Sequence, residues 1–85
     1  MNAAPEVLVI IPAFNEQDSI GHTLEGLHEA LPGMPVLVVD DGSTDETTLR
    51  AKSKGAEVIT LPCHLGLGGS VQTGYRYAYE AGYQY

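Results

Sequence analysis

The sequence predicts an α/β fold in which a parallel sheet is built in the order β-α-β-α-β-α, and three observations lead to that class. Two short apolar runs, Val7–Ile11 and Val36–Val39, do not alternate with polar residues and suit strands buried on both faces. Residues 20–31 and 71–78 repeat apolar residues at helical spacing. Proline or glycine separates one segment from the next. This alternation predicts right-handed crossovers and helices on the faces of the sheet.

Local signals place the first helix and the second strand. Pro12 is expected to end the first strand, and Asn15 is expected to cap the helix that follows. Leu31-Pro32-Gly33 marks the end of that helix. One apolar stripe should run along it through Ile20, Leu24, Leu27 and Leu31. The second strand should close on Asp40-Asp41-Gly42.

The second half of the chain continues the alternation. Ser43 and Glu46 predict a capping box that opens a short helix ending near Gly55. The third strand, Glu57–Leu61, should stop at Pro62. The glycine-rich segment 65–69 is expected to be a loop, followed by a helix that carries Val71, Tyr75 and Ala78 on one face. Residues 83–85 indicate the opening of a fourth strand.

Composition limits the class of protein and of partner. The 85 residues are 44% hydrophobic and 18% charged, which is typical of one globular domain. The formal net charge is −7, and the only basic residues close together are Arg50, Lys52 and Lys54. No nucleic-acid partner is therefore expected, and these three side chains should form the solvated face of a helix.

The single cysteine and the length of the apolar runs indicate the cellular location of the chain. Cys63 cannot form an internal disulfide and is expected to be a small buried residue. The longest apolar run, Val7–Ile11, is far too short to span a bilayer, and no signal-peptide pattern is present. The sequence therefore predicts a cytoplasmic chain.

Function is expected at the carboxyl edge of the sheet, where parallel α/β folds bind their ligands. Three segments should meet there: 12–16, 40–43 and the glycine-rich segment from Gly66. Asp40 and Asp41 repel each other, so a structural role requires a partner, with one carboxylate capping the following helix and the other solvated. In a functional role they accept hydrogen bonds from nucleobase N–H groups or ribose hydroxyls, away from phosphate.

The neighbouring loop residues each allow two interpretations. Phe14 either packs under the first helix or lines a base pocket together with the backbone of Pro12 and Ala13. Glu16 either favours the helix dipole or bonds a ribose.

The glycine-rich segment also has two interpretations. Gly66, Gly68 and Gly69 either form a tight turn or let the backbone approach a ligand, with helix N–H groups available to an anion. His64 is either an ordinary loop histidine or a phosphate contact. No catalytic residue and no metal ligand are assigned, because beyond Asp40 and Asp41 there is no carboxylate pair of D-x-D type.

Three motifs, VIIPAFNE at 9–16, VVDDGSTD at 38–45 and LGLGGSVQTG at 65–74, resemble family 2 glycosyltransferases, which include dolichyl-phosphate mannose synthase-like and bacterial polysaccharide transferases. The resemblance implies a Rossmann-like sheet at the N-terminal side of a GT-A fold. It also implies a UDP-, GDP- or dTDP-linked sugar donor and inverting transfer to a lipid-phosphate or saccharide acceptor. In that family the segment matching Pro12, Phe14 and Glu16 borders the nucleotide, while the acidic pair contacts base and ribose. We place the base contact on Asp41.

The resemblance also bears on what the chain contains. The segment matching Gly66–Gly69 lies near the same pocket, and His64 stands where an asparagine is frequent. Family members continue into a D-x-D motif that coordinates Mg²⁺ or Mn²⁺ and then supply a catalytic base. Residues 1–85 are therefore expected to be the nucleotide-binding portion, truncated before that motif, with no metal bound and little or no transfer. For the full-length protein we also expect a location at the cytoplasmic face of the membrane. The competing hypothesis is a non-enzymatic module that self-associates through an open sheet edge.

Overall fold

The computed structural model describes residues 7–62 and 64–83, and within them strands and helices alternate as predicted. In chain order they are β1 (Val9–Ala13), α1 (Ile20–Ala30), β2 (Val36–Asp40), α2 (Thr47–Ser53), β3 (Glu57–Thr60) and α3 (Gly66–Glu80). The sheet has the order β1-β2-β3, and both strand pairs are parallel. The predicted α/β class is confirmed.

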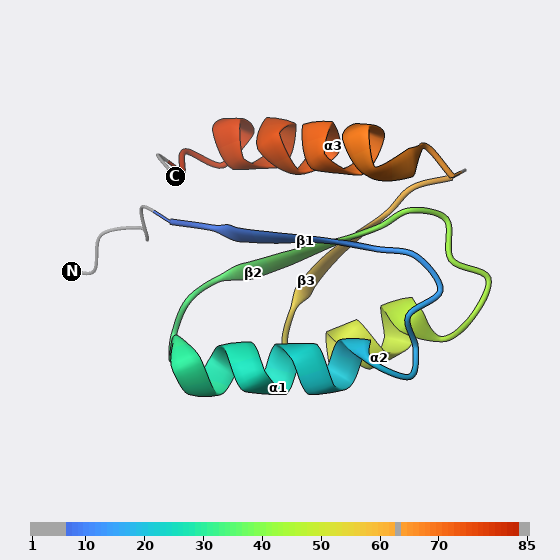
Figure 1. Cartoon of the computed structure of the whole chain (residues 1–85). Coiled ribbons are helices and arrows are strands. Elements are labelled where there is room, and N and C mark those ends of the chain that lie inside the picture. The colour runs from blue at the N-terminus through green and yellow to red at the C-terminus, as the bar shows by residue number, and fades with distance from the viewer. Residues whose placement is uncertain (1–6, 63, 84–85) are drawn as a thin grey trace.

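Helices cover both faces of the sheet. Figure 1 shows α1 and α2 on one face and α3 on the other, with the strands running toward the loops that precede α1 and α2. All five residues of β2 are buried, because this strand is central in the sheet and helices cover both of its faces. Its alternate side chains enter two separate cores: Val36 and Val38 pack toward α1 and α2, whereas Leu37 and Val39 lie in the cluster beneath α3.

The inward face of α3 differs from the predicted one. Tyr75 is 62% exposed, whereas Ser70, Gly74 and Ala78 follow one another along the side that meets the sheet. These small residues, four positions apart, let the helix lie close to β1. A Cβ added at Gly74 would be 2.5 Å from Cγ2 of Ile10, so only glycine fits there.

Pro12 lies inside β1 and does not end it. Val9 N–H donates to the Pro35 carbonyl at 3.1 Å, and the Ala13 carbonyl accepts from Asp41 N–H at 2.8 Å. Because bonding residues alternate along a strand, the nitrogen of Pro12 faces away from β2. Proline is tolerated at such a position on an edge strand.

Other boundaries also differ from the expected ones. β1 begins at Val9, β3 ends at Thr60, and α3 already begins at Gly66, so the glycine-rich segment forms a helical turn instead of a loop. Tyr83 N–H donates to the Ala78 carbonyl at 2.9 Å and closes the end of α3. The rest of the predicted fourth strand and the predicted burial of Cys63 fall outside the described residues.

Candidate functional site

The loops after β1 and β2 are joined side by side at the carboxyl edge of the sheet. Asn15 N–H donates to Ser43 Oγ at 2.8 Å, and Asn15 Oδ1 accepts from Thr44 N–H at 2.8 Å. Asn15 has a φ of 50°, a left-handed conformation that asparagine adopts more readily than most residues. Its predicted role as the cap of α1 is wrong, because α1 starts only at Ile20 and Asn15 is bound to the neighbouring loop.

The same two loops are joined further along. Glu16 N–H donates to Thr47 Oγ1 at 2.8 Å, and Gln17 N–H donates to Asp45 Oδ2 at 3.2 Å. Gln17 Oε1 accepts from Glu46 N–H at 3.1 Å. We call residues 15–17 and 43–47 the paired loops. Their hydrogen bonds connect residues 28 to 31 positions apart in sequence and fix the loops relative to each other.

The predicted capping box is also wrong. α2 begins at Thr47, and the carboxylate of Asp45, not the hydroxyl of Ser43, accepts the Thr47 N–H at 2.9 Å. Burial alone would raise the pKa of Asp45. The hydroxyl and N–H of Thr47 and the N–H of Gln17 outweigh that effect and hold the pKa below its usual value.

Asp40 is buried at 1% exposure and serves the loop that follows it. Its Oδ1 accepts the hydroxyl of Ser43, and its Oδ2 accepts the hydroxyl of Thr48 at 2.7 Å. Both carboxylate oxygens therefore have side-chain partners within the chain. This carboxylate connects the end of β2 to the first turn of α2.

Asp41 is buried at 3% exposure and joins β2 to the start of α3. Its carboxylate accepts the N–H groups of Leu65 at 2.7 Å and Gly66 at 2.8 Å, and His64 Nδ1 lies 2.7 Å from Oδ2. Burial would raise the pKa of Asp41, but the two N–H groups and His64 outweigh it and lower the pKa. Neither member of the acidic pair is solvated, so the structural alternative in which one carboxylate is solvated does not hold.

Ser70 is a further polar residue at this position that sequence reasoning did not single out. The residue is 1% exposed, and its hydroxyl lies near enough to Asp41 to lower that pKa further. It makes no hydrogen bond of ordinary geometry within the described residues. Only the placement of Ser70 on the inward face of α3 reveals it, and that face was mispredicted.

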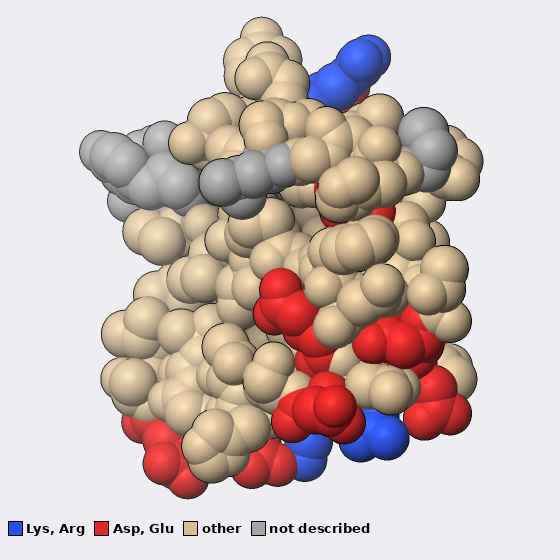
Figure 2. Space-filling model, turned by 45° about the vertical axis from the view of Figure 1, so that its right-hand side comes forward, with Lys and Arg blue, Asp and Glu red and all other residues tan. Residues whose placement is uncertain are grey.

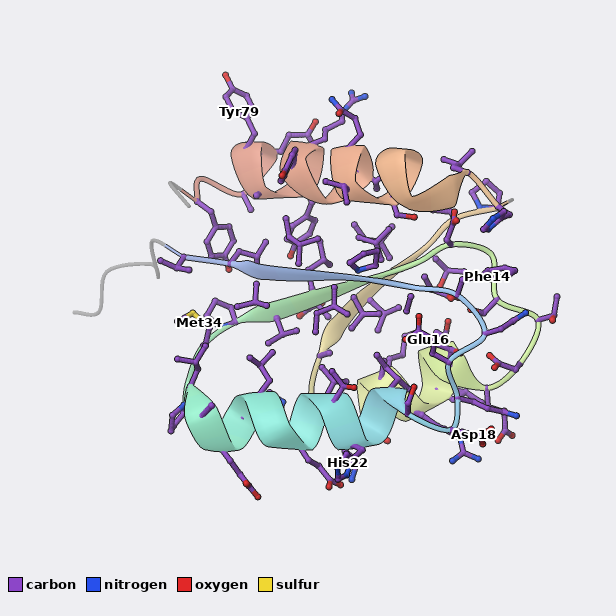
Figure 3. The ribbon with its side chains drawn as sticks, viewed as in Figure 1. Phe14, Glu16, Asp18, His22, Met34 and Tyr79 are labelled. Atoms are coloured by element: carbon purple, nitrogen blue, oxygen red, sulfur yellow. The ribbon has the colours of Figure 1, made fainter. Side chains whose placement is uncertain are left out.

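Phe14 and His64 form an exposed aromatic pair above Asp41. Their ring centroids are 4.3 Å apart and the planes are tilted by 44°. Phe14 is 39% exposed, so it does not pack under α1. Figure 3 shows Phe14 and Glu16 together at the loop end of the sheet, far from Tyr79 on the outer side of α3. His64 lies before α3 and contacts both Phe14 and Asp41, which neither of its two sequence-based interpretations included.

The glycines at the start of α3 meet different constraints. Gly66 has a φ of 81°, which favours glycine, and a Cβ on Gly69 would lie 2.6 Å from Cβ of Leu65. A Cβ on Gly68 would meet nothing within 4 Å.

Pro12 is half-buried and Ala13 is buried at the end of β1. The predicted segments thus meet at one edge, although several of their residues are already engaged within the chain.

The surface around this edge carries more acidic than basic side chains. Figure 2 shows Asp and Glu gathered on the part of the surface formed by the α1 and α2 side. Arg50 pairs with Glu46 at 3.3 Å and Lys54 pairs with Glu25, and Arg50 and Lys52 are exposed as expected. In residues 7–62 and 64–83, no three Asp, Glu, His or Cys side chains gather as metal ligands. No described helix is long and apolar enough to cross a membrane.

Comparison with known proteins shows which family the chain resembles. The sequence profile of glycosyl transferase family 2 matches residues 8–82. An undecaprenyl-phosphate mannosyltransferase of Micrococcus luteus is 43% identical over 82 residues, which cover 91% of this chain and 34% of that protein. A glucosyl-3-phosphoglycerate synthase of Mycolicibacterium smegmatis is 40% identical over 60 residues, covering 68% of this chain and 20% of that protein.

Solved structures give the same result. The glucosyl-3-phosphoglycerate synthase of Mycobacterium tuberculosis, in complex with Mn²⁺, UDP and glucosyl-3-phosphoglycerate, superposes with a TM-score of 0.71 at 28% identity. The superposition covers 82% of this chain and 28% of that one. The chain spans about a third of the length of the first curated relatives it matches, 30% and 34%.

Proposed function

Because this chain belongs to glycosyl transferase family 2 and shares the fold of GT-A glycosyltransferases, we propose that residues 1–85 form the nucleotide-binding portion of such a domain. The proposed ligand is a UDP-, GDP- or dTDP-linked sugar. The proposed reaction of the whole enzyme is inverting transfer to a lipid-phosphate or saccharide acceptor. Complexes of the Mycobacterium tuberculosis synthase with UDP and with UDP-glucose support this ligand class.

One observation carries the proposal: a buried carboxylate and an exposed aromatic ring lie together at the carboxyl edge of the sheet. Asp41 lies at the end of β2 and, with a lowered pKa, is ionised at neutral pH. Phe14 offers a ring face next to it, bridged by His64. A nucleobase is a flat ring with N–H donors, so it is suited to an aromatic face and a carboxylate acceptor.

The proposed contacts are distributed over this edge. The base packs against Phe14 and donates to Asp41, and the exposed Glu16 side chain accepts from the ribose. Asp40 contributes by holding Ser43 and Thr48, which fix the loop beside the base. The full proposed site is Pro12, Ala13, Phe14, Glu16, Asp40, Asp41, Gly66, Gly68 and Gly69.

In inverting transfer a base removes the proton of an acceptor hydroxyl, the oxygen attacks the anomeric carbon, and the nucleoside diphosphate leaves. We assign no residue of this chain to the base. The described residues also do not fit a divalent metal site, because no three ligands gather and both carboxylates of the acidic pair are buried and hydrogen-bonded. We therefore assign no residue of this chain as a ligand for the Mn²⁺ that the solved relative binds.

Calorimetric titration of the chain with UDP and GDP, each with and without Mn²⁺, tests the proposal. We expect weak binding that does not require the metal. Asp41→Asn should weaken it by about tenfold or more, since a hydrogen bond to a charged group is worth that much. Phe14→Ala should weaken it by about two- to tenfold, since a stacked aromatic pair is worth about 0.5–1.5 kcal/mol. Asp18→Asn, an exposed carboxylate before α1, is the matched control. Binding that neither site variant changes would contradict the proposed site.

A non-enzymatic, self-associating module is the second candidate. Within the described residues β1 and β3 each pair with one strand only, so the sheet has two edges on which another strand can add. Sedimentation velocity over a range of concentrations tests this, and a monomer at all concentrations would exclude it.

A further inference from the structure

The imidazole of His64 touches two of the residues to which the proposed function assigns the base. Its ring centroid is 4.3 Å from that of Phe14, and its Nδ1 is 2.7 Å from Asp41 Oδ2. The same nitrogen lies 3.2 Å from the Asp41 carbonyl oxygen. A flat ring with an N–H group thus already lies against the aromatic face and the buried carboxylate.

A bound nucleobase would need the same two surfaces. It would place one ring against Phe14 and one N–H group on Asp41, as the imidazole does now. Asp41 already accepts two N–H groups, from Leu65 and Gly66, besides its contact with His64. These donors fill three of the roughly four lone-pair positions of a carboxylate. The Asp41 side chain is only 5% exposed, so a base N–H competes with the imidazole for access to it.

We propose that His64 is an internal occupant of the base position, and that a nucleotide must displace its imidazole to bind. This inference rests on the proposed function and adds its regulation: the free chain holds the site closed with its own side chain. Displacement requires no rearrangement of Asp41, because the Leu65 and Gly66 N–H groups continue to hold the carboxylate in place.

The exposure of His64 allows such a movement. Its side chain is 56% exposed, in contrast to 5% for Asp41. Among the described residues, Asp41 supplies its polar contacts and Phe14 its ring contact. The imidazole can therefore swing into water, where its nitrogens regain hydrogen bonds, while the base takes over both contacts.

Titration of wild type, His64→Ala and His64→Asn with UDP tests the inference. Removing the ring should tighten UDP binding about three- to tenfold, the gain expected when the open state makes up roughly a tenth to a third of the free chain. His64→Asn keeps a donor for Asp41 but no aromatic ring, so its affinity should lie between the other two. His22→Ala, which removes an exposed histidine of α1, should leave the affinity unchanged.

A second measurement reports the movement directly. In ¹H–¹⁵N spectra of the imidazole nitrogens, saturating UDP should move the His64 signals toward those of a solvated histidine, while the His22 signals stay fixed. Unchanged His64 signals, or equal or weaker UDP binding by folded His64→Ala, would overturn the inference and leave the proposed function standing. If neither wild type nor the folded variants bind UDP or GDP at millimolar concentration, both fail.

Discussion

Gly74 on α3 lies directly against Ile10 on β1, so closely that a Cβ at position 74 would be 2.5 Å from Cγ2 and 3.1 Å from Cδ1 of Ile10. Gly74→Ala should therefore lower the free energy of unfolding by about 1–2 kcal/mol, because the overpacking penalty exceeds the gain in helix propensity. Urea unfolding followed by circular dichroism measures it.

The matched control is Gly26→Ala in α1. A Cβ there would meet nothing within 4 Å, so this substitution should raise the free energy of unfolding by about 0.5–1 kcal/mol. A Gly74→Ala protein as stable as the Gly26→Ala protein would show that α3 does not lie this close to β1.

Thr47→Val tests the paired loops. The buried Thr47 hydroxyl accepts the Glu16 N–H at 2.8 Å and donates to Asp45, and valine keeps the shape but removes the oxygen. Thr47→Val should lower the free energy of unfolding by about 1–3 kcal/mol, because Glu16 N–H loses its acceptor. Thr47→Ser should be milder, and Thr44→Val, an exposed neighbour, should change stability by less than about 0.5 kcal/mol. Similar losses at positions 44 and 47 would argue against the pairing.

Asp40→Asn should act on stability more than on ligand binding. Both oxygens of Asp40 accept hydroxyl groups, and an amide can accept through only one. Urea unfolding should show a free energy of unfolding lower by about 1.5–3 kcal/mol. The affinity for UDP should fall less than it does in Asp41→Asn. If Asp40→Asn abolished binding in a fully stable protein, Asp40 would be a direct ligand contact instead.

Acidification should destabilise the chain through Asp41 and Asp45. Both have a pKa in the folded state below the usual 3.8, so the folded state binds fewer protons than the unfolded state. The stability they contribute is complete at neutral pH. It is lost as the pH falls below about 4 and through the lowered folded-state pKa values. Urea midpoints measured from pH 7 to pH 2.5 should fall steeply at the acid end.

Asp45→Asn should flatten this pH dependence, and the exposed Asp18→Asn should not. An unchanged acid slope in the Asp45 variant would show that its hydrogen bonds from Thr47 and Gln17 do not favour the ionised form.

The order of elements could be predicted because it depends on local patterns. Apolar runs such as Val36–Val39 identify buried strands without knowledge of their neighbours, and the acidic pair at 40–41 marks the carboxyl end of the second strand. The placement of Pro12 inside β1 could not be predicted in this way. It depends on which backbone N–H groups of the strand point toward β2, and this is known only once the register is known.

The interior of the candidate site was the least predictable part. The sequence suggested a capping box at Ser43 and a helix cap at Asn15, since both residues commonly serve that purpose. Instead they bind each other across 28 residues, and His64 reaches Asp41 across 23. Local propensity carries no information on partners that only the fold brings together.

The paired loops divide the residues that build them into two kinds. Glu16 takes part only through its main-chain N–H, whereas side-chain oxygens are supplied by Asn15, Gln17, Ser43, Asp45 and Thr47. The tolerance for substitution among homologues should therefore differ between positions of these loops. The side chain at position 16 can diverge with the ligand while the scaffold stays intact, but positions 15, 17, 43, 45 and 47 should retain an oxygen-bearing side chain in every relative that keeps these loops.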